Sequence, residues 1–188
     1  MANVDRTGFQ PVENNPSEEL KFTVDASSST AMFVGDVVDV NAAGSVRPAA
    51  GSAPTQSVGV CIALYDSNGV PVGHPNSTVS TKYLTASVAG QALVALAKPG
   101  KRFVAQSQTG KTPAAADVFA TTDLTNGSGN TTTAVSGHEL KYSTLNTEGQ
   151  FLILGKVEEP GNSYGVNVDL YVSFNESIFG PNGKSTGV

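Results

Sequence analysis

Few residues in this chain have the types and spacing that catalysis or metal binding requires. The two histidines, His74 and His138, stand in "GHPN" and "SGHEL", and no second ligand follows at the HExxH or HxH spacing of metal sites. We therefore expect exposed loop histidines. The stretch "TGKT" at 109–112 is similar to the end of a phosphate-binding loop. That loop needs a glycine five residues before the Gly-Lys pair, where this chain has Ala105.

The acidic residues form pairs rather than a cluster. The pairs at 18–19 and 158–159 could exchange protons, but one falls in a segment without periodicity and the other beside a turn, where solvated charge is expected. Asp36 and Asp39 have a spacing found among calcium ligands, without further oxygen ligands in a fixed loop. The single cysteine, Cys61, lies in an apolar run, which predicts a buried, inert thiol. The sequence thus predicts no catalytic, metal or cofactor residues, and we expect that the chain is not an enzyme.

The composition indicates a β-rich protein and argues against two classes of partner. Charged residues make up 14% of the 188 residues, against roughly 25% in average proteins. Exposed helical faces would need more Lys and Glu, so strands and turns are favoured. The net charge is −5 without a Lys/Arg-rich run, and no nucleic-acid binding is expected. Because the sequence has neither an apolar stretch of membrane-spanning length nor a signal-peptide core, we expect synthesis in a cytoplasm and no membrane contact.

The chain divides into an N-terminal arm, a β-domain and a tail. Residues 1–19 show neither helical nor strand periodicity and predict an extended N-terminal arm, with a frayed terminus as the alternative. Residues 20–178 predict an all-β fold, an antiparallel β-barrel or β-sandwich, and residues 179–188 a flexible tail. The isolated apolar residues that could anchor the arm to a partner are Val4, Phe9 and Val12.

Several strands and turns follow from local patterns. Residues 57–66, "SVGVCIALYD", are almost continuously apolar and predict a central strand buried on both faces. In "GVNVDLYVSF" at 165–174, apolar and polar residues alternate, which predicts a strand with one buried face, paired in a hairpin with "FLILGKVEE". "KPGK" at 98–101 predicts a type II turn that closes a hairpin over 91–107. Residues 79–88 are a further expected strand.

A glycine within a strand-like run and a long Thr/Asn/Gly-rich segment give two further predictions. Gly35, inside an otherwise strand-like run, indicates a bulge or a close approach of two backbones. Residues 111–150 are ambiguous: "PAAAD" predicts a short helical turn, and the Thr/Asn/Gly-rich stretch that follows predicts a loop or an edge hairpin. Whether this segment belongs to the β-domain or forms an inserted lobe stays open.

Two stretches carry a family resemblance. "FVGDVVDVNAAGSVRPAAGSAPTQSVGVCIALYDSNGVPVG" followed by "LTASVAGQALVALAKPGKRFVAQSQTG" resembles the capsid decoration (cement) proteins of tailed bacteriophages. The likeness lies in a Gly-Asp-x-Val strand, a Gly turn, a Val-Gly-Val central strand, and a Gly-led strand that turns into the next. The later "GKVEEPGNSYGVNVDLYVSFNES" is similar to the final hairpin of phage head and virion structural proteins.

The resemblance implies a structural role in a virion. Proteins of this kind are small β-barrels that bind the outer surface of an icosahedral head, often as homotrimers, and staple neighbouring major capsid proteins. The N-terminal arm, residues 3–12 here, would add a strand to the capsid protein, after synthesis in the host cytoplasm. Two alternatives stay open: a carbohydrate-binding or receptor-binding β-module of a virion fibre, and a tail-tube or head-tail joining protein.

Overall fold

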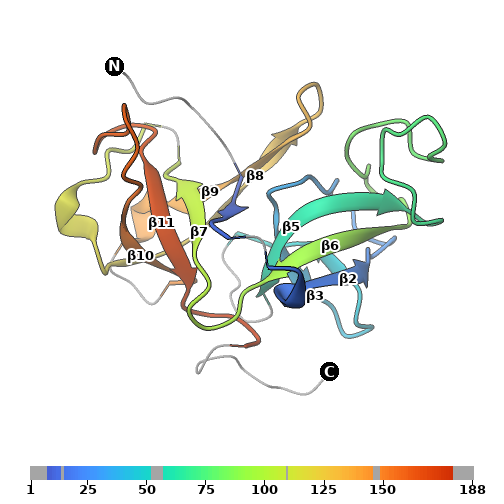
Figure 1. Ribbon diagram of the computed structural model, residues 1–188, viewed down its shortest axis with the longest axis horizontal. Coiled ribbons are helices and arrows are strands. Elements are labelled where there is room, and N and C mark those ends of the chain that lie inside the picture. The colour runs from blue at the N-terminus through green and yellow to red at the C-terminus, as the bar shows by residue number, and fades with distance from the viewer. Residues whose placement is uncertain (1–7, 14, 52–56, 109, 146–148, 180–188) are drawn as a thin grey trace.

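The computed structural model describes residues 8–13, 15–51, 57–108, 110–145 and 149–179, and its strands form two antiparallel sheets that lie side by side (Figure 1). The expected all-β fold of antiparallel strands is confirmed. The described helical elements are three single 3-10 turns, η1 (Pro16–Glu18), η2 (Ala115–Asp117) and η3 (Tyr142–Thr144). No helix in the described ranges is long and apolar enough to cross a membrane.

The first sheet has six strands in the order β1-β7-β11-β10-β8-β9. Its centre is the hairpin of β10 and β11, in which Ile153 faces Val172, so the predicted hairpin near the end of the chain is confirmed. The bounds of these strands are β1 (Gln10–Pro11), β7 (Phe103–Gln106), β8 (Thr121–Asn130), β9 (Val135–Lys141), β10 (Phe151–Lys156) and β11 (Asp169–Phe174). A parallel bridge between Ser107 and Leu140 links the end of β7 to β9 and curls the sheet.

The second sheet has five strands in the order β2-β6-β5-β3-β4, and we call it the half-barrel because a bridge brings its two outer strands together. Its central strand is the apolar run at 57–66, as the sequence predicts. The bounds are β2 (Glu19–Thr23), β3 (Val37–Val40), β4 (Val46–Pro48), β5 (Ser57–Asp66) and β6 (Gly90–Leu96). A bridge from Val24 to Val46, with the Asp25 N–H donating to the Val46 carbonyl at 2.8 Å, brings the two outer strands together.

One hydrophobic core joins the two sheets. Phe103, Phe151 and Leu170 of the six-stranded sheet pack in the same buried cluster as Val60 and Ala95 of the half-barrel. A second cluster fills the interior of the half-barrel itself. Because side chains on one face of β5 and β6 serve the first cluster and those on the other face serve the second, the two sheets form one domain rather than two independent units.

The segment that precedes the half-barrel packs on this domain instead of standing away from it. β1 pairs with β7, with Gln10 opposite Val104, and the Val12 N–H donates to the Arg102 carbonyl at 3.0 Å. Phe9 is 1% exposed, and its ring centroid lies 4.9 Å from that of Phe151. An apolar ring gains more from the core than from water, so residues 8–13 of the extended arm predicted over 1–19 pack on the domain.

Two local predictions were wrong. The "KPGK" turn forms, with Gly100 at φ +83° and the Lys101 N–H donating to the Lys98 carbonyl, but β6 and β7 on its two sides belong to different sheets. The turn therefore carries the chain from one sheet to the other and closes no hairpin. Residues 79–88 contain a single bridge, from Leu84 to Met32, and no named strand.

The uncertain segment 111–150 is part of the domain. After η2, β8 and β9 form a hairpin at the edge of the six-stranded sheet, and its turn projects from the body in Figure 1. Leu124 and Leu140 of this hairpin are buried in the shared core. The tail expected over 179–188 lies outside the described residues except for Phe179, which is exposed.

Candidate functional site

A buried polar cluster lies where the half-barrel meets the β8–β9 hairpin. The Ser136 hydroxyl donates to Asp36 Oδ1 at 2.6 Å, and the Phe33 N–H donates to Asp36 Oδ2 at 2.8 Å. The Val37 N–H donates to His138 Nδ1 at 3.0 Å. The cluster thus joins the start of β3 to β9, two strands that belong to different sheets.

These contacts fix the protonation of the histidine. Since His138 Nδ1 accepts a hydrogen bond, a neutral ring carries its proton on Nε2. Burial lowers the pKa of His138, with the charge of Asp36 acting in the opposite direction. Burial likewise raises the pKa of Asp36, against the effect of His138 and two hydrogen bonds. A neutral imidazole is the form that suits this environment.

A close approach of two glycines allows the cluster to form. Gly35 has φ +94° and Gly8 has φ +89°, and a Cβ on Gly35 would lie 3.2 Å from both Gly8 Cα and Ser136 Cβ. The Phe9 N–H donates to the Gly35 carbonyl at 2.8 Å, and the Gly8 N–H donates to the His138 carbonyl at 2.9 Å. The close approach predicted for Gly35 is confirmed, and it lets the N-terminal segment pass between β3 and β9.

Two clefts open on the surface of the domain. One, with a volume of 430 Å³, lies over the Asp36 and His138 pair, between the β8–β9 hairpin and the segments at 29–31 and 48–50. The other, of 320 Å³, lies beside the N-terminal segment and includes Val12 and residues 99–102. Ion pairs flank this second cleft: Lys101 with Glu18 at 3.0 Å and Arg102 with Glu13 at 3.6 Å.

One aromatic side chain is presented to solvent in an unusual way. Phe119 is 74% exposed and has φ +69°, a left-handed conformation that costs a non-glycine residue energy. Its N–H donates to the Ile153 carbonyl at 2.8 Å, and the Ala120 N–H donates to the Asp117 carbonyl, so the turn after η2 is tied to β10. The backbone therefore holds this ring outward from a fixed position.

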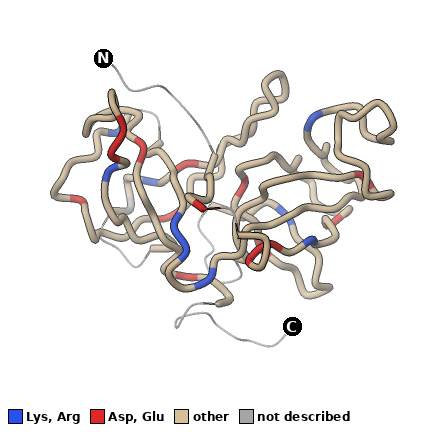
Figure 2. Tube along the Cα trace, in the orientation of Figure 1, with Lys and Arg blue, Asp and Glu red and all other residues tan. Residues whose placement is uncertain are grey.

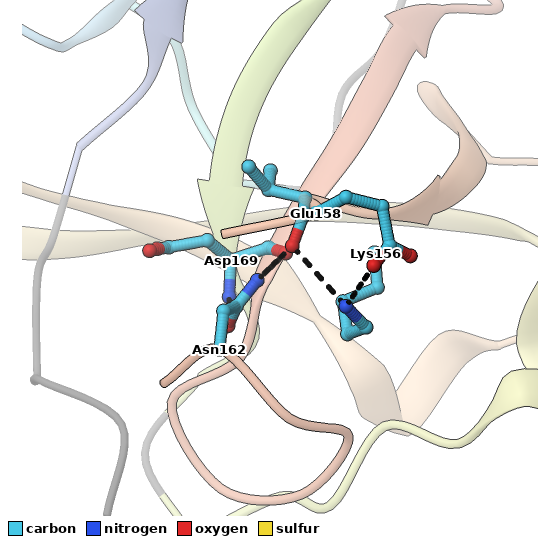
Figure 3. A network of polar contacts seen from close by, with 5 residues as sticks. Lys156, Glu158, Asn162 and Asp169 are labelled. Carbon is cyan, nitrogen blue, oxygen red and sulfur yellow. Dashed lines mark hydrogen bonds and ion pairs between the residues drawn. The ribbon is translucent and has the colours of Figure 1, made fainter. Parts of the chain in front are cut away.

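The loop between β10 and β11 is held by hydrogen bonds from one side chain. The Asn162 side-chain amide donates to the carbonyls of Val157 and Asp169 at 2.8 and 2.9 Å, and its oxygen accepts the Asp169 N–H (Figure 3). Lys156 forms an ion pair with Glu158 at 2.8 Å. One side chain thus holds both ends of the loop.

Residues of that loop and of η2 act on the phenol of Tyr142. Tyr164 of the loop is exposed. Burial raises the pKa of Tyr142, and Asp117 of η2 and Tyr164 add to the effect. Phe119 follows Asp117 by two residues, and we call the two exposed aromatic residues Phe119 and Tyr164 the aromatic end of the molecule.

The residues predicted to anchor a partner lie in three different settings. Val4 lies outside the described residues. The ring of Phe9 is inside the core of the chain itself, where no partner can reach it. Val12 is half-buried and borders the smaller cleft. The structure thus brings Phe9 and Val12 onto one segment, with only Val12 at the surface.

The histidines also fall in two classes. His74 is exposed, as expected, but the expectation that His138 is exposed was wrong: it is 4% exposed and lies within β9. The missed signal is the alternation of Ser136, His138 and Leu140, which puts the histidine on the buried face with the leucine. Asp36 and Asp39 are buried, and no group of three metal-ligating side chains occurs in the described part of the chain.

Comparison of the sequence and structure with known proteins found no match. No protein-family model matches the sequence, no curated protein matches it, and no solved structure matches the fold.

Proposed function

We propose that the chain is a virion structural protein that decorates the outer surface of an icosahedral phage head, located in the virion and bound to the major capsid protein. The observation that carries the proposal is the outward-held Phe119 at the aromatic end of a rigid β-domain. A positive φ at a non-glycine residue costs energy and persists only where the surrounding structure holds it in place. Such strained residues are often found at functional contacts. The resemblance to decoration proteins supports the same role.

The chemistry of Phe119 suits docking on a protein surface. Aromatic side chains dominate the binding energy of protein interfaces when they enter a pocket of the partner. Covering an exposed phenylalanine would contribute about 1.5–3 kcal/mol. Because a virion repeats the contact at many equivalent positions, a modest energy at each position resists the pressure of packaged DNA over the whole shell.

The N-terminal segment has a divided role in this proposal. Phe9 secures the segment to the domain, whereas Val4 and Val12 are the residues that contact the capsid protein. A strand contributed by the residues before Gly8 would pair with a sheet edge of the capsid protein and satisfy its unpaired backbone groups. A homotrimer would bring three such segments together over neighbouring capsid subunits.

Co-sedimentation with heads assembled from the major capsid protein of the same virus tests the proposal. Four chains are compared: wild type, a chain lacking residues 1–7, Phe119→Asp, and Leu20→Asp. Leu20 is the matched control, since it is 51% exposed on β2 at the edge of the other sheet. We expect saturable binding of the wild type and Leu20→Asp at one fixed stoichiometry, and at least tenfold weaker binding of the other two.

The proposal fails if Phe119→Asp and the truncated chain both saturate heads like the wild type. Loss of binding only in Leu20→Asp would also contradict it, since the docking face would then be the half-barrel. Saturation of tails or necks without saturation of heads would favour the tail-tube or joining role.

A further inference from the structure

The 430 Å³ cleft over the polar cluster is lined by His138, whose Nε2 donor pairs with no described protein group. His138 Nδ1 is occupied by the Val37 N–H, which leaves the proton on Nε2. Asp36 Oδ1 lies 3.8 Å from Nε2, beyond hydrogen-bond range, and Nε2 has no hydrogen-bond partner within the described ranges. Because His138 lines the cleft, a ligand there that accepts a hydrogen bond can pair with this donor.

An acceptor stands beside this donor. Asp36 Oδ1 receives one hydrogen bond, from Ser136, and Oδ2 receives one, from Phe33, so each oxygen has capacity for another donor. A ligand hydroxyl placed between Nε2 and Oδ1 can accept from the first and donate to the second. A hydroxyl does both at a single atom.

The walls of the cleft combine polar side chains with apolar surface. Phe33, Ala49 and Ala50 supply the apolar part, and a Cβ added at Gly129 would overlap the Phe33 ring, so the hairpin backbone lies directly against it. The polar lining residues besides the Asp36 and His138 pair are Ser29, Thr30, Asn126, Ser128 and Thr131. This mixture resembles a surface for a ring with hydroxyls on its rim and C–H groups on its face.

The charge of the cleft limits the ligand further. Among the described lining residues none is Lys or Arg, and the projecting part of the β8–β9 hairpin carries no charged residue (Figure 2). A buried carboxylate in a lining without Lys or Arg disfavours an anionic ligand. The volume lies within the roughly 300–1,000 Å³ range of small-molecule sites. We propose that the cleft binds a neutral saccharide of one or two rings, independently of any contact with a capsid.

Titration of the ¹⁵N-labelled chain with D-glucose, D-galactose, N-acetyl-D-glucosamine and their β1,4-linked disaccharides, followed by amide NMR, tests this. We expect at least one neutral sugar to shift the amide signals of Ala50 and residues 127–129. Ala50→Trp and Ser29→Trp, which fill the cleft from two different lining segments, should weaken that sugar at least tenfold. Ala116→Trp, at an exposed alanine of η2, is the matched control and should leave its affinity unchanged.

A charged comparator makes the test sharper. D-glucuronate has the ring of glucose with one carboxylate, and we expect it to bind at least fivefold more weakly than the neutral sugar. The inference is overturned if no sugar of the panel shifts these amides up to 100 mM. It is also overturned if both tryptophan variants bind as the control does, or if glucuronate binds more tightly. None of these outcomes depends on whether heads are bound.

Discussion

Phe9→Ala removes the ring that fixes the N-terminal segment in the core. Phe9 is fully buried against Phe151, and the segment is also held by hydrogen bonds to Gly35 and Arg102. Replacing a buried phenylalanine with alanine costs about 3–5 kcal/mol, because the lost burial is followed by an unfilled cavity. With about 2 kcal/mol per molar urea as the slope for a domain of this size, the unfolding midpoint should fall by about 1.5–2.5 M.

Urea unfolding followed by circular dichroism measures this change, with Phe119→Ala as the control. Phe119 is exposed, so its loss should change the free energy of unfolding by less than about 0.5 kcal/mol. If Phe9→Ala stays within 1 kcal/mol of the wild type, as a rough threshold set by the scatter of surface substitutions, the segment is not part of the core. The same cost would accompany deletion of residues 1–15, whereas deletion of residues 1–7 leaves Phe9 in place.

Three further results are expected. Since burial holds the pKa of His138 below its usual 6.5, the unfolded chain takes up a proton first as the pH falls. Stability should therefore fall as the pH drops below 6.5, by at most about 1 kcal/mol down to pH 5.5. Urea unfolding should find no such slope in His138→Asn. Gly35→Ala should lower the melting temperature more than Gly100→Ala, because both have positive φ but nothing lies within 4 Å of a Cβ at Gly100. Asn162→Ala should speed amide hydrogen exchange at Asp169, while Glu158→Ala, whose side chain is 84% exposed, should not.

The sequence was a good guide wherever burial follows a local period. The alternation in β11, the continuous apolar run of β5 and the glycine of the "KPGK" turn each predicted what the structure contains. These patterns depend on residues within ten positions of one another. They specify that a segment is a strand or a turn, without specifying which strand it pairs with.

Pairing over long distances was not predictable from local patterns. β6 and β7 flank a good turn, yet they join different sheets, and Phe103 of β7 packs with Phe151 and Leu170 in the shared core. The residues around Phe9 show no periodic pattern, so the sequence predicts an anchor for a partner there. A single ring that fills a gap in the core produces no periodic pattern that could reveal its burial. The Asp36 and His138 pair comes from residues far apart in the chain, so only the burial of His138 was within reach of the sequence.

The pairing of β1 with β7 determines an order of events during synthesis. Gln10 leaves the ribosome early, but its partner Val104 follows only after every strand of the half-barrel has been made. Domains fold as the chain emerges, from the N-terminus onward. The half-barrel can therefore assemble on the nascent chain while β1 waits, and Phe9 enters its place only when Phe151 has arrived. We therefore expect folding during synthesis to begin with the half-barrel, β2 to β6, and to end with the first and last strands, β1 and β11.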